Sequence, residues 1–379
     1  MKNEAFINCL STFLPNDPIH NDEMEDFLGL IQEKHSRVKN IVLRQNGIAT
    51  RYYALTKQQT ITHTNAELAA NAIKGLFKSS NELNKIELLT TATSIPDQIL
   101  PSHASMVHGL LKNGSMELFS TAGVCLTSLQ ALKIAYQSIC LGDKKNAVCC
   151  ASESVSATLL SKHYDTEYEK CHDIGENPYY GFEKDFLRFM LSDGAGASLI
   201  GSKPDKNNIS LKIEWIDMES FANELPTCML LGGNFREDGE VISWKSFENS
   251  ALIEKSIFAV KQNIKLLKQY IISYWVNHIE KCLAKHNIPA TDIQYVIPHV
   301  SSMFFYHKLL EEIEKRNIDL KEEKWFTNLT SVGNIGSASI FIALEEFMRN
   351  QSLKTGDKIL LLVPESGRFS YGTALLSVS

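Results

Sequence analysis

The chain lacks the cysteine patterns that bind metals or cross-link secreted proteins. Its eight cysteines, in 379 residues, include no Cys-x-x-Cys pair and no Cys/His spacing of a zinc site. Cys171 is followed directly by His172, but the sequence holds no second pair to complete a site. We therefore expect neither a metal nor a cofactor. Free thiols without a secretion signal indicate a reducing, cytoplasmic setting.

The sequence also lacks the features of membrane and nucleic-acid-binding proteins. No apolar run reaches the roughly 18 residues that a membrane span requires. The first residues, Met1-Lys-Asn-Glu-Ala, are not a basic stretch followed by an apolar core, so we expect no signal peptide. The net charge is −6 and no lysine or arginine run occurs, which argues against a nucleic-acid surface.

What the chain does contain is an alternation of apolar strands and helices. Strands are expected at residues 5–14, 86–92, 116–120, 146–152, 209–216, 295–299, 325–328, 358–363 and 371–378. Residues 250–286 predict one long helix or two. The length suits two halves of about 180 residues, each able to bury its own core, and the polar segment 203–208 is the expected boundary. Alternating strands and helices predict two α/β units.

The most informative stretch is residues 119–136. A short strand turns at Gly123 into an apolar helix with almost no charge, and Cys125 stands at this turn. The free N–H groups of a helix N-terminus favour a thiolate, which is the nucleophilic form of cysteine. Free cysteine is also among the most buried and inert residue types, so the position alone does not establish catalysis.

Two residues of the second half stand at comparable turns. His299 ends a predicted strand in Pro298-His-Val-Ser-Ser, and Asn334 lies in Gly333-Asn-Ile-Gly-Ser-Ala-Ser, which leads into another apolar helix. Each has an ordinary explanation, as a boundary histidine and as a turn or cap asparagine. Four further candidates are interpreted as helix-face or turn polar residues rather than bases: Glu153, Asp193, His103 and His108.

Taken in order, these motifs resemble the β-ketoacyl-acyl-carrier-protein synthase III family of the thiolase superfamily, over nearly the whole chain. The resemblance rests on Gly47-Ile-Ala-Thr-Arg-Tyr-Tyr, Thr93-Ser-Ile-Pro-Asp, Pro101-Ser, Ala122-Gly-Val-Cys, Asp193-Gly-Ala-Gly-Ala, Pro298-His, Gly333-Asn-x-x-Ser-Ala-Ser and Gly367-Arg-Phe-Ser-Tyr-Gly. It implies a five-layered αβαβα thiolase-like fold of two pseudo-repeated halves, residues 1–202 and 203–379, and a homodimer.

The resemblance also implies roles for particular residues. Cys125 would be the nucleophile that takes an acyl group from a thioester, which divides one difficult condensation into two easier steps. His299 and Asn334 would stabilise the enolate of the second thioester by hydrogen bonding in a dry site. The backbone N–H groups of Cys125 and Gly367 would form an oxyanion hole. Leu100 would reach into the partner's acyl pocket.

Several departures from the family pattern bear on the substrate. Val300-Ser-Ser follows the histidine where many relatives have Gln-Ala-Asn, and Ile41 and Gln45 replace the Trp and Arg that hold a coenzyme A adenine. Both changes favour carrier-protein-bound substrates, and Leu100, smaller than the usual Phe, leaves room for a longer acyl chain. The polar stretch 165–185 is an extension, interpreted as a lid, a carrier-protein dock or a structural insertion.

Within the family, three segments most resemble the ketosynthases that form dialkylresorcinols and cyclohexanediones: Asn46-Gly-Ile-Ala-Thr-Arg-Tyr-Tyr, Pro298-His-Val-Ser-Ser and Val363-Pro-Glu-Ser-Gly-Arg-Phe-Ser-Tyr. Such enzymes join a β-ketoacyl and a usually α,β-unsaturated acyl thioester and close a 1,3-dione ring. We therefore predict an acyltransferase of this kind, with acyl carrier protein and acyl thioesters as partners. The alternatives are a fatty-acid initiation synthase that uses malonyl-carrier protein, an acyltransferase to an alcohol or amine, and a non-catalytic subunit.

Overall fold

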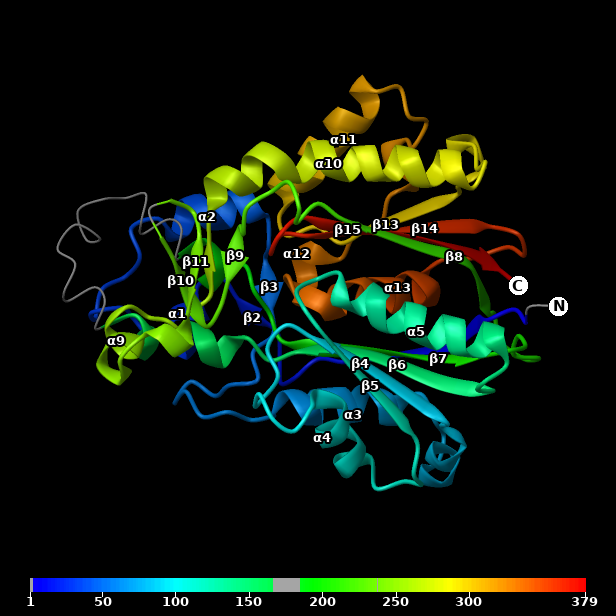
Figure 1. Ribbon diagram of the computed structural model, residues 1–379, viewed down its shortest axis with the longest axis horizontal. Coiled ribbons are helices and arrows are strands. Elements are labelled where there is room, and N and C mark those ends of the chain that lie inside the picture. The colour runs from blue at the N-terminus through cyan, green and yellow to red at the C-terminus, as the bar shows by residue number, and fades with distance from the viewer. Residues whose placement is uncertain (1–2, 166–184, 237) are drawn as a thin grey trace.

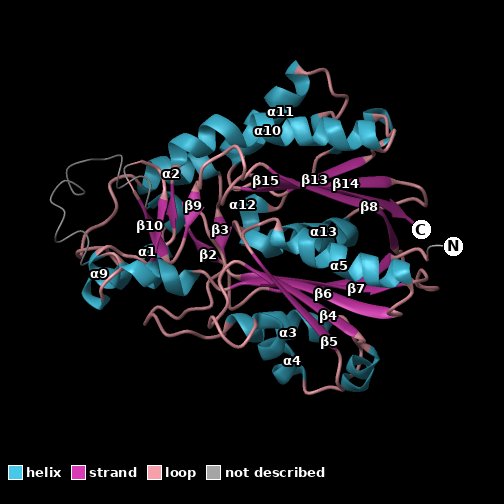
Figure 2. Ribbon diagram, viewed as in Figure 1, coloured by secondary structure: helices cyan, strands magenta, loops and turns pink. Residues whose placement is uncertain are grey.

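The computed structural model describes residues 3–165, 185–236 and 238–379, and its elements stack in five layers (Figure 1). Two layers are β-sheet and three are helical, as Figure 2 shows by colour. The sheets are covered from outside by helices α3 (Asn65–Gly75), α4 (His103–Leu111), α10 (Ile264–Lys285) and α11 (Met303–Lys315). The space between the sheets is filled by α5 (Thr127–Leu141) and α13 (Ser339–Asn350). The predicted αβαβα fold is confirmed.

The first sheet has the order β1-β7-β6-β4-β5, and β5 forms its edge. All of its strands run parallel except β7, which lies antiparallel between β1 and β6. Their bounds are β1 (Phe6–Phe13), β4 (Leu88–Thr93), β5 (Glu117–Ala122), β6 (Asn146–Glu153) and β7 (Gly194–Gly201). Since β6 and β7 are buried on both faces, their sequences are nearly continuous runs of small and apolar residues.

The second sheet, in the order β13-β14-β15-β8, repeats this arrangement with β15 as its antiparallel strand. Its bounds are β8 (Leu211–Ser220), β13 (Tyr295–Pro298), β14 (Lys358–Glu365) and β15 (Ser370–Val378). A short ladder between β1 and β8 joins the two sheets, so nine strands of the described chain are continuous. The strand expected at 325–328 is wrong: Trp325 makes only an isolated bridge to Val296. The boundary between residues 202 and 203 stays a prediction.

The two antiparallel strands carry matched glycines against the middle helices. A Cβ at Gly196 in β7 would lie 2.7 Å from the Cβ of Phe341 on α13. A Cβ at Gly372 in β15 would lie 2.9 Å from Leu129 on α5. Each glycine therefore lets a helix approach the sheet more closely than any side chain would permit, and this close packing fixes where α5 and α13 begin.

Local capping signals in the sequence mark where several helices start. Thr64 and Glu67 form a complete capping box at α3, and Ser102 caps α4 through the N–H of Ser105. Ser302 caps α11 in the same way. Residues 250–286 form two helices rather than one, because a short strand lies between α9 (Asn249–Glu254) and α10.

Smaller elements cluster at one end of the layers, at the left of Figure 1. They are β2 (Ile19–His20), α1 (Met24–Leu28), α2 (Lys39–Asn46), β3 (Thr50–Arg51), β9 (Met229–Leu230), β10 (Gly233–Phe235), β11 (Val241–Ser243) and β12 (Lys261–Gln262). The short helix α12 (Leu329–Val332) lies nearer the centre of the view and contacts β3. Within the described ranges, no helix combines the length and the apolar character needed to cross a bilayer.

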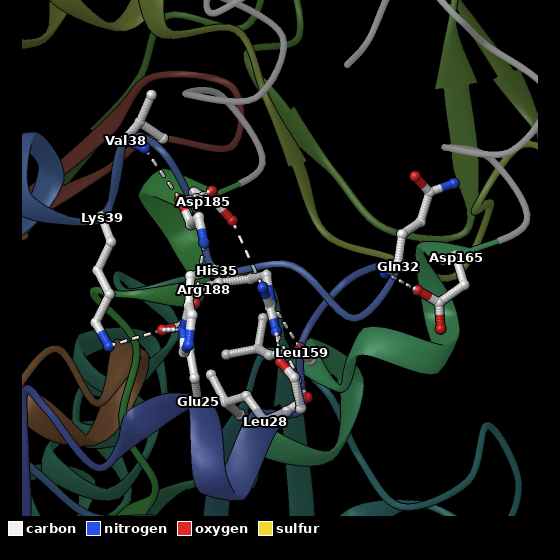
Figure 3. Close-up of polar contacts among 12 residues, drawn as sticks. Glu25, Leu28, Gln32, His35, Val38, Lys39, Leu159, Asp165, Asp185 and Arg188 are labelled. Carbon is white, nitrogen blue, oxygen red and sulfur yellow. Dashed lines mark hydrogen bonds and ion pairs between the residues drawn. The ribbon is translucent and has the colours of Figure 1, made fainter.

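The two described ends of the polar stretch 165–185 are fixed to one segment near the N-terminus (Figure 3). The carboxylate of Asp165 accepts the N–H of Gln32 at 2.8 Å. Asp185 accepts a hydrogen bond from the Ser36 hydroxyl, and Nη1 of Arg188 lies 3.6 Å from its other oxygen. The prediction of a lid, dock or insertion concerns residues between these ends, which lie outside the described residues.

Candidate active site

A cavity of about 340 Å³ lies where parallel strands of both sheets end. Cys125 follows β5, Glu153 ends β6, His299 follows β13 and Asn334 precedes α13, and all four line the cavity. The carboxyl ends of strands are the usual place for ligands in α/β sheets. The rest of the wall is mostly apolar, including Val155, Leu187, Met190, Met229, Val260, Leu267, Ile271, Trp275 and Phe305. The structure thus brings Cys125, His299 and Asn334 together, as the sequence predicts.

Cys125 is buried, with 8% of its surface exposed, and precedes the first residue of α5 by two positions. Its carbonyl accepts the hydroxyl of Ser128 at 3.0 Å, which fixes the turn. Burial raises the pKa of the thiol well above its usual range, and the carboxylates of Glu153 and Glu365 raise it further. Desolvation and these carboxylates therefore oppose the thiolate that the helix terminus is expected to favour. Cys125 needs a base to become a nucleophile.

His299 supplies a neutral imidazole to the wall of the same cavity. Its backbone N–H donates to the carbonyl of Leu362 at 2.8 Å, which holds the residue at the end of β13. Burial lowers the pKa of the ring to about 4, so the imidazole is uncharged near neutral pH. Among the described residues its Nδ1 atom has no hydrogen-bonding partner. A neutral imidazole has one donor and one acceptor nitrogen, so His299 can both accept a proton and donate a hydrogen bond.

Asn334 is held on both its backbone and its side chain. Its N–H donates to the carbonyl of Met190 at 3.1 Å, and its carbonyl accepts the N–H of Ser192 at 2.9 Å. The side-chain Oδ1 accepts the N–H of Gly336 at 3.0 Å. Because Oδ1 is engaged, the Nδ2 amide remains as a donor for a group in the cavity.

The two remaining predicted residues are not part of the cavity wall. Gly367 lies next to Ser366, which does line the cavity, and its carbonyl accepts the N–H groups of Cys228 and Met229. Its own N–H faces the carboxylate of Glu365, so its place in an oxyanion hole stays a prediction. Leu100 is 82% exposed, which leaves it free to contact a second chain.

Sequence reasoning missed two kinds of cavity residue. The inner face of α10 supplies Leu267, Ile271 and Trp275, whose spacing of four residues predicts a buried face but not that a cavity lies in front of it. Glu153, interpreted above as a helix-face or turn residue, instead ends β6, is fully buried and lines the cavity. Glu153 stands directly after an apolar run, and this position in the sequence could have indicated a residue at the end of a buried strand.

Comparison with known proteins gives the same family throughout. The model described as 3-Oxoacyl-[acyl-carrier-protein (ACP)] synthase III C terminal matches residues 283–378. The β-ketoacyl-[acyl-carrier-protein] synthase III of Clostridium perfringens strain ATCC 13124 is 25% identical over 382 residues, covering 100% of both chains. The enzyme of that name from Xanthomonas campestris pv. campestris strain 8004 is 24% identical, with 96% of this chain and 95% of the relative covered.

Solved structures of low sequence identity share the fold. AbyA1, a tetronic acid condensing enzyme, superposes with a TM-score of 0.73 at 18% identity, covering 98% of this chain and 99% of that chain. OleA of Xanthomonas campestris, solved with lauric acid and lauroyl-CoA, superposes with a TM-score of 0.74 at 18% identity, covering 100% of both.

The fold is that of solved 3-oxoacyl-(acyl carrier protein) synthase III enzymes. The family model matches the C-terminal part of the chain, and the similarity to enzymes named β-ketoacyl-[acyl-carrier-protein] synthase III extends over its whole length.

Proposed function

We propose that this ketosynthase joins two acyl thioesters through an acyl-Cys125 intermediate and forms a cyclohexanedione or resorcinol precursor. The observation that carries the proposal is the meeting of Cys125, His299 and Asn334 on the wall of one apolar cavity. Its volume of about 340 Å³ falls at the lower end of small-molecule sites. The apolar wall suits a hydrocarbon chain, while the three polar residues suit a thioester group.

The first step loads the nucleophile. The Cys125 sulfur attacks the thioester carbonyl as its proton passes to neutral His299. A new acyl–sulfur bond forms, the bond to the carrier thiol breaks, and the departing thiolate takes the proton from His299. The N–H groups of Cys125 and Gly367 would stabilise the oxyanion between these events.

The second step forms the carbon–carbon bond. The α-carbon of a β-ketoacyl thioester lies between two carbonyl groups, so it is acidic enough to lose a proton to neutral His299 and give an enolate. The protonated imidazole of His299 and the amide of Asn334 then donate hydrogen bonds to the enolate oxygen. The enolate carbon attacks the acyl group, and the departing Cys125 thiolate takes the proton from His299. With an α,β-unsaturated acyl group, the γ-carbon of the β-ketoacyl part would then add to the C=C bond, which becomes a single bond as the 1,3-dione ring closes; the proton lost from the γ-carbon goes to the α-carbon of the former double bond.

A carrier protein is the proposed donor. A surface groove of about 400 Å³ shares Ile272 and Phe305 with the cavity and carries Lys268 at its rim. Lys268 lies over the ring of Phe304 and makes no ion pair within the described ranges, so it is available to the phosphate of a phosphopantetheine arm. Ile41, at the position of the adenine-binding Trp, is 44% exposed on α2. An exposed aliphatic residue offers an adenine less stacking surface than an aromatic ring.

A second candidate is fatty-acid initiation with malonyl-carrier protein, which the names of the curated relatives favour. In that reaction the enolate arises by loss of carbon dioxide rather than of a proton. The residues at the site would serve either source of enolate, so the substrates must separate the two candidates.

The test is intact-protein mass spectrometry of wild type and Cys125→Ala after incubation with medium-chain acyl-carrier protein or the matching acyl-coenzyme A. We expect an acyl adduct from the carrier protein, absent in Cys125→Ala, and a cyclic dione once a β-ketoacyl partner is added. No adduct from either donor would refute the acyl-cysteine mechanism. A linear product formed only with malonyl-carrier protein would favour the second candidate.

Asn334→Ala separates condensation from simple acyl transfer. A condensing enzyme needs the amide for its enolate, so this variant should still load Cys125 but lose product formation by about a hundredfold, the typical effect of one oxyanion donor. An acyltransferase to an alcohol or amine needs no enolate. Full turnover by Asn334→Ala would therefore support that alternative and contradict the ketosynthase proposal.

A further inference from the structure

Glu153 is a buried carboxylate that the two steps above do not use. It has no exposed surface, it ends β6 in the first half, and it lines the cavity between Cys125 and the Asn334 turn. An unpaired charge in such a place is costly unless hydrogen bonds compensate it. Hydrogen bonds from two separate segments of the chain supply this compensation.

Four donors converge on one oxygen of Glu153. Its Oε1 accepts the N–H and the hydroxyl of Ser94, at 3.0 and 2.7 Å. The same Oε1 accepts the N–H and the hydroxyl of Ser337, at 3.1 and 2.6 Å. Ser94 follows β4 in the first half, and Ser337 belongs to the turn before α13 in the second half. The carboxylate therefore ties together two cavity segments that lie far apart in the sequence.

The Ser337 turn is the one that orients the catalytic amide. Gly336, next to Ser337, donates the N–H that engages Oδ1 of Asn334 at 3.0 Å. Gly336 also packs on the carboxylate: its φ is +48°, and a Cβ there would lie 3.0 Å from Oε1 of Glu153. A shift of Ser337 would thus move the N–H of Gly336 and release the Asn334 amide.

We propose that Glu153 is a positioning residue, whose carboxylate holds the Gly336–Ser337 turn so that the Nδ2 amide of Asn334 points at the enolate oxygen. This inference rests on the proposed role of Asn334 and adds the group that fixes its geometry. Glu153 is assigned this role rather than that of a base because its Oε1 is fully engaged by four donors from the two segments, and its Oε2 accepts the N–H of Ser94 at 3.1 Å and the hydroxyl of Thr93 at 3.4 Å.

Glu153 carries a second, electrostatic consequence that the test can exploit. Its negative charge is one cause of the raised pKa of Cys125, and Glu365 is another. Removing either charge should lower the thiol pKa, but only Glu153 touches the turn that holds Asn334. Glu365 shares the electrostatic effect and lacks the contact with the Asn334 turn, but its carboxylate accepts the N–H of Gly367, the proposed oxyanion donor. Because that donor would serve loading and condensation alike, Glu365 is a control for the rate of condensation relative to the rate of loading.

The experiment compares Glu153→Gln, Ser337→Ala, their double variant and Glu365→Gln in two assays. The first follows acyl transfer to Cys125 by mass spectrometry, and the second follows consumption of the acyl enzyme by the carbon nucleophile. A glutamine keeps one acceptor oxygen but turns its NH₂ group toward donors, so the turn should shift. We expect Glu153→Gln to load Cys125 but to consume the acyl group about tenfold to a hundredfold more slowly, because displacing a catalytic group such as the Asn334 amide by about 1 Å slows a reaction by up to about a hundredfold.

Ser337→Ala should reproduce this slowing, and the double variant should be no slower than the worse single variant, because both act through one contact. In both Glu365→Gln and Glu153→Gln, alkylation of Cys125 by iodoacetamide should shift to lower pH. In Glu365→Gln, however, loading and condensation should change by the same factor. Fully additive effects of Glu153→Gln and Ser337→Ala, or an equal fall of condensation relative to loading in Glu365→Gln, would overturn the proposal. Ser337→Ala keeps the test decisive if Glu153→Gln does not fold. If Asn334→Ala condenses normally, the proposed function itself fails.

Discussion

Burial decides the protonation state of the imidazoles around this site. His103, on α4, is 3% exposed, and its Nε2 lies 2.9 Å from the hydroxyl of Ser152 on β6. Burial lowers its pKa to about 4, as it does for His299. Both rings are thus neutral in the native protein at pH values where the unfolded chain would protonate them. This difference makes histidine burial a source of acid instability.

We expect His103→Gln to reduce the loss of stability on acidification. Between pH 6.5 and 4 the unfolded chain binds a proton at His103 and the native protein does not, so stability falls as the pH falls. A lowering from 6.5 to about 4 corresponds to up to about 3 kcal/mol. Urea unfolding at pH 7, 5 and 4 measures the free energy of unfolding of wild type and variant. The contributions of His299 and the buried carboxylates are the same in both proteins, so they cancel in the difference. Parallel pH profiles would contradict the prediction.

The meeting of Cys125, His299 and Asn334 in one cavity could be predicted from the sequence, but their protonation could not. Each of the three follows a recognisable strand or glycine turn, and the order of these motifs along the chain resembles that of the synthase III family. The state of the Cys125 thiol depends on how many atoms exclude water and on two carboxylates, Glu153 and Glu365, contributed by distant segments. A local sequence pattern indicates that a residue lies at a helix terminus, but it does not show how far the fold removes that residue from water.

Among the elements, α10 shapes the cavity most directly. Leu267, Ile271 and Trp275 follow one another at intervals of one turn along its inner face. This face spans about 12 Å, at the usual rise of a helix, and runs along the apolar part of the wall. The size of one side chain on it should therefore set how long an acyl chain can enter.

Ile271→Trp should shift the substrate preference toward short acyl chains. The larger ring occupies cavity volume, so the relative kcat/KM of a long over a short acyl donor should fall by about tenfold or more. Ile271→Ala should move the preference in the opposite direction. Gln269→Trp, on the exposed side of the same helix, is the control for the substitution itself. An unchanged chain-length profile in Ile271→Trp would show that α10 does not bound the acyl site.

Elements with local signals were predicted well, and elements that depend on pairing were not. The capping box of Thr64 and Glu67 and the cap at Ser102 are local sequence signals, and α3 and α4 begin at them. The segment at Trp325 has strand-like composition but obtains only one bridge, to Val296. Whether a segment becomes a strand depends on the neighbour that the whole fold places beside it.

At the scale of the whole molecule, the unpaired edge of the first sheet is the feature that favours association with a second chain. β5 pairs on one side only, with β4, and exposes 40% of Phe119. Ile99 and Leu100 are 73% and 82% exposed. An unpaired edge beside exposed apolar side chains is a site for association with another chain. The homodimer inferred from the family resemblance would cover these residues and bring Leu100 to the partner's cavity.

Phe119→Asp should therefore convert the protein from a dimer to a monomer, because it places a charge in the apolar edge. Light scattering after size-exclusion chromatography measures the mass directly. Leu141→Asp is the matched control, since Leu141 is 78% exposed at the end of α5, outside the β5 edge. A wild-type monomer, or an equal effect of both substitutions, would exclude this edge as the interface.

The position of α5 between two sheets has a consequence for the protein's synthesis. The strands of the first sheet end at Gly201, so this half can fold while the ribosome is still translating the second. The helix that packs beside α5 in the middle layer begins only at Ser339. At usual elongation rates of about 5 to 20 residues per second, this delay is about 7 to 28 s. Throughout this delay the nascent chain exposes the apolar surface that α13 later covers. Slower codons or less chaperone should therefore lower the yield of folded protein, but not the activity of each folded molecule.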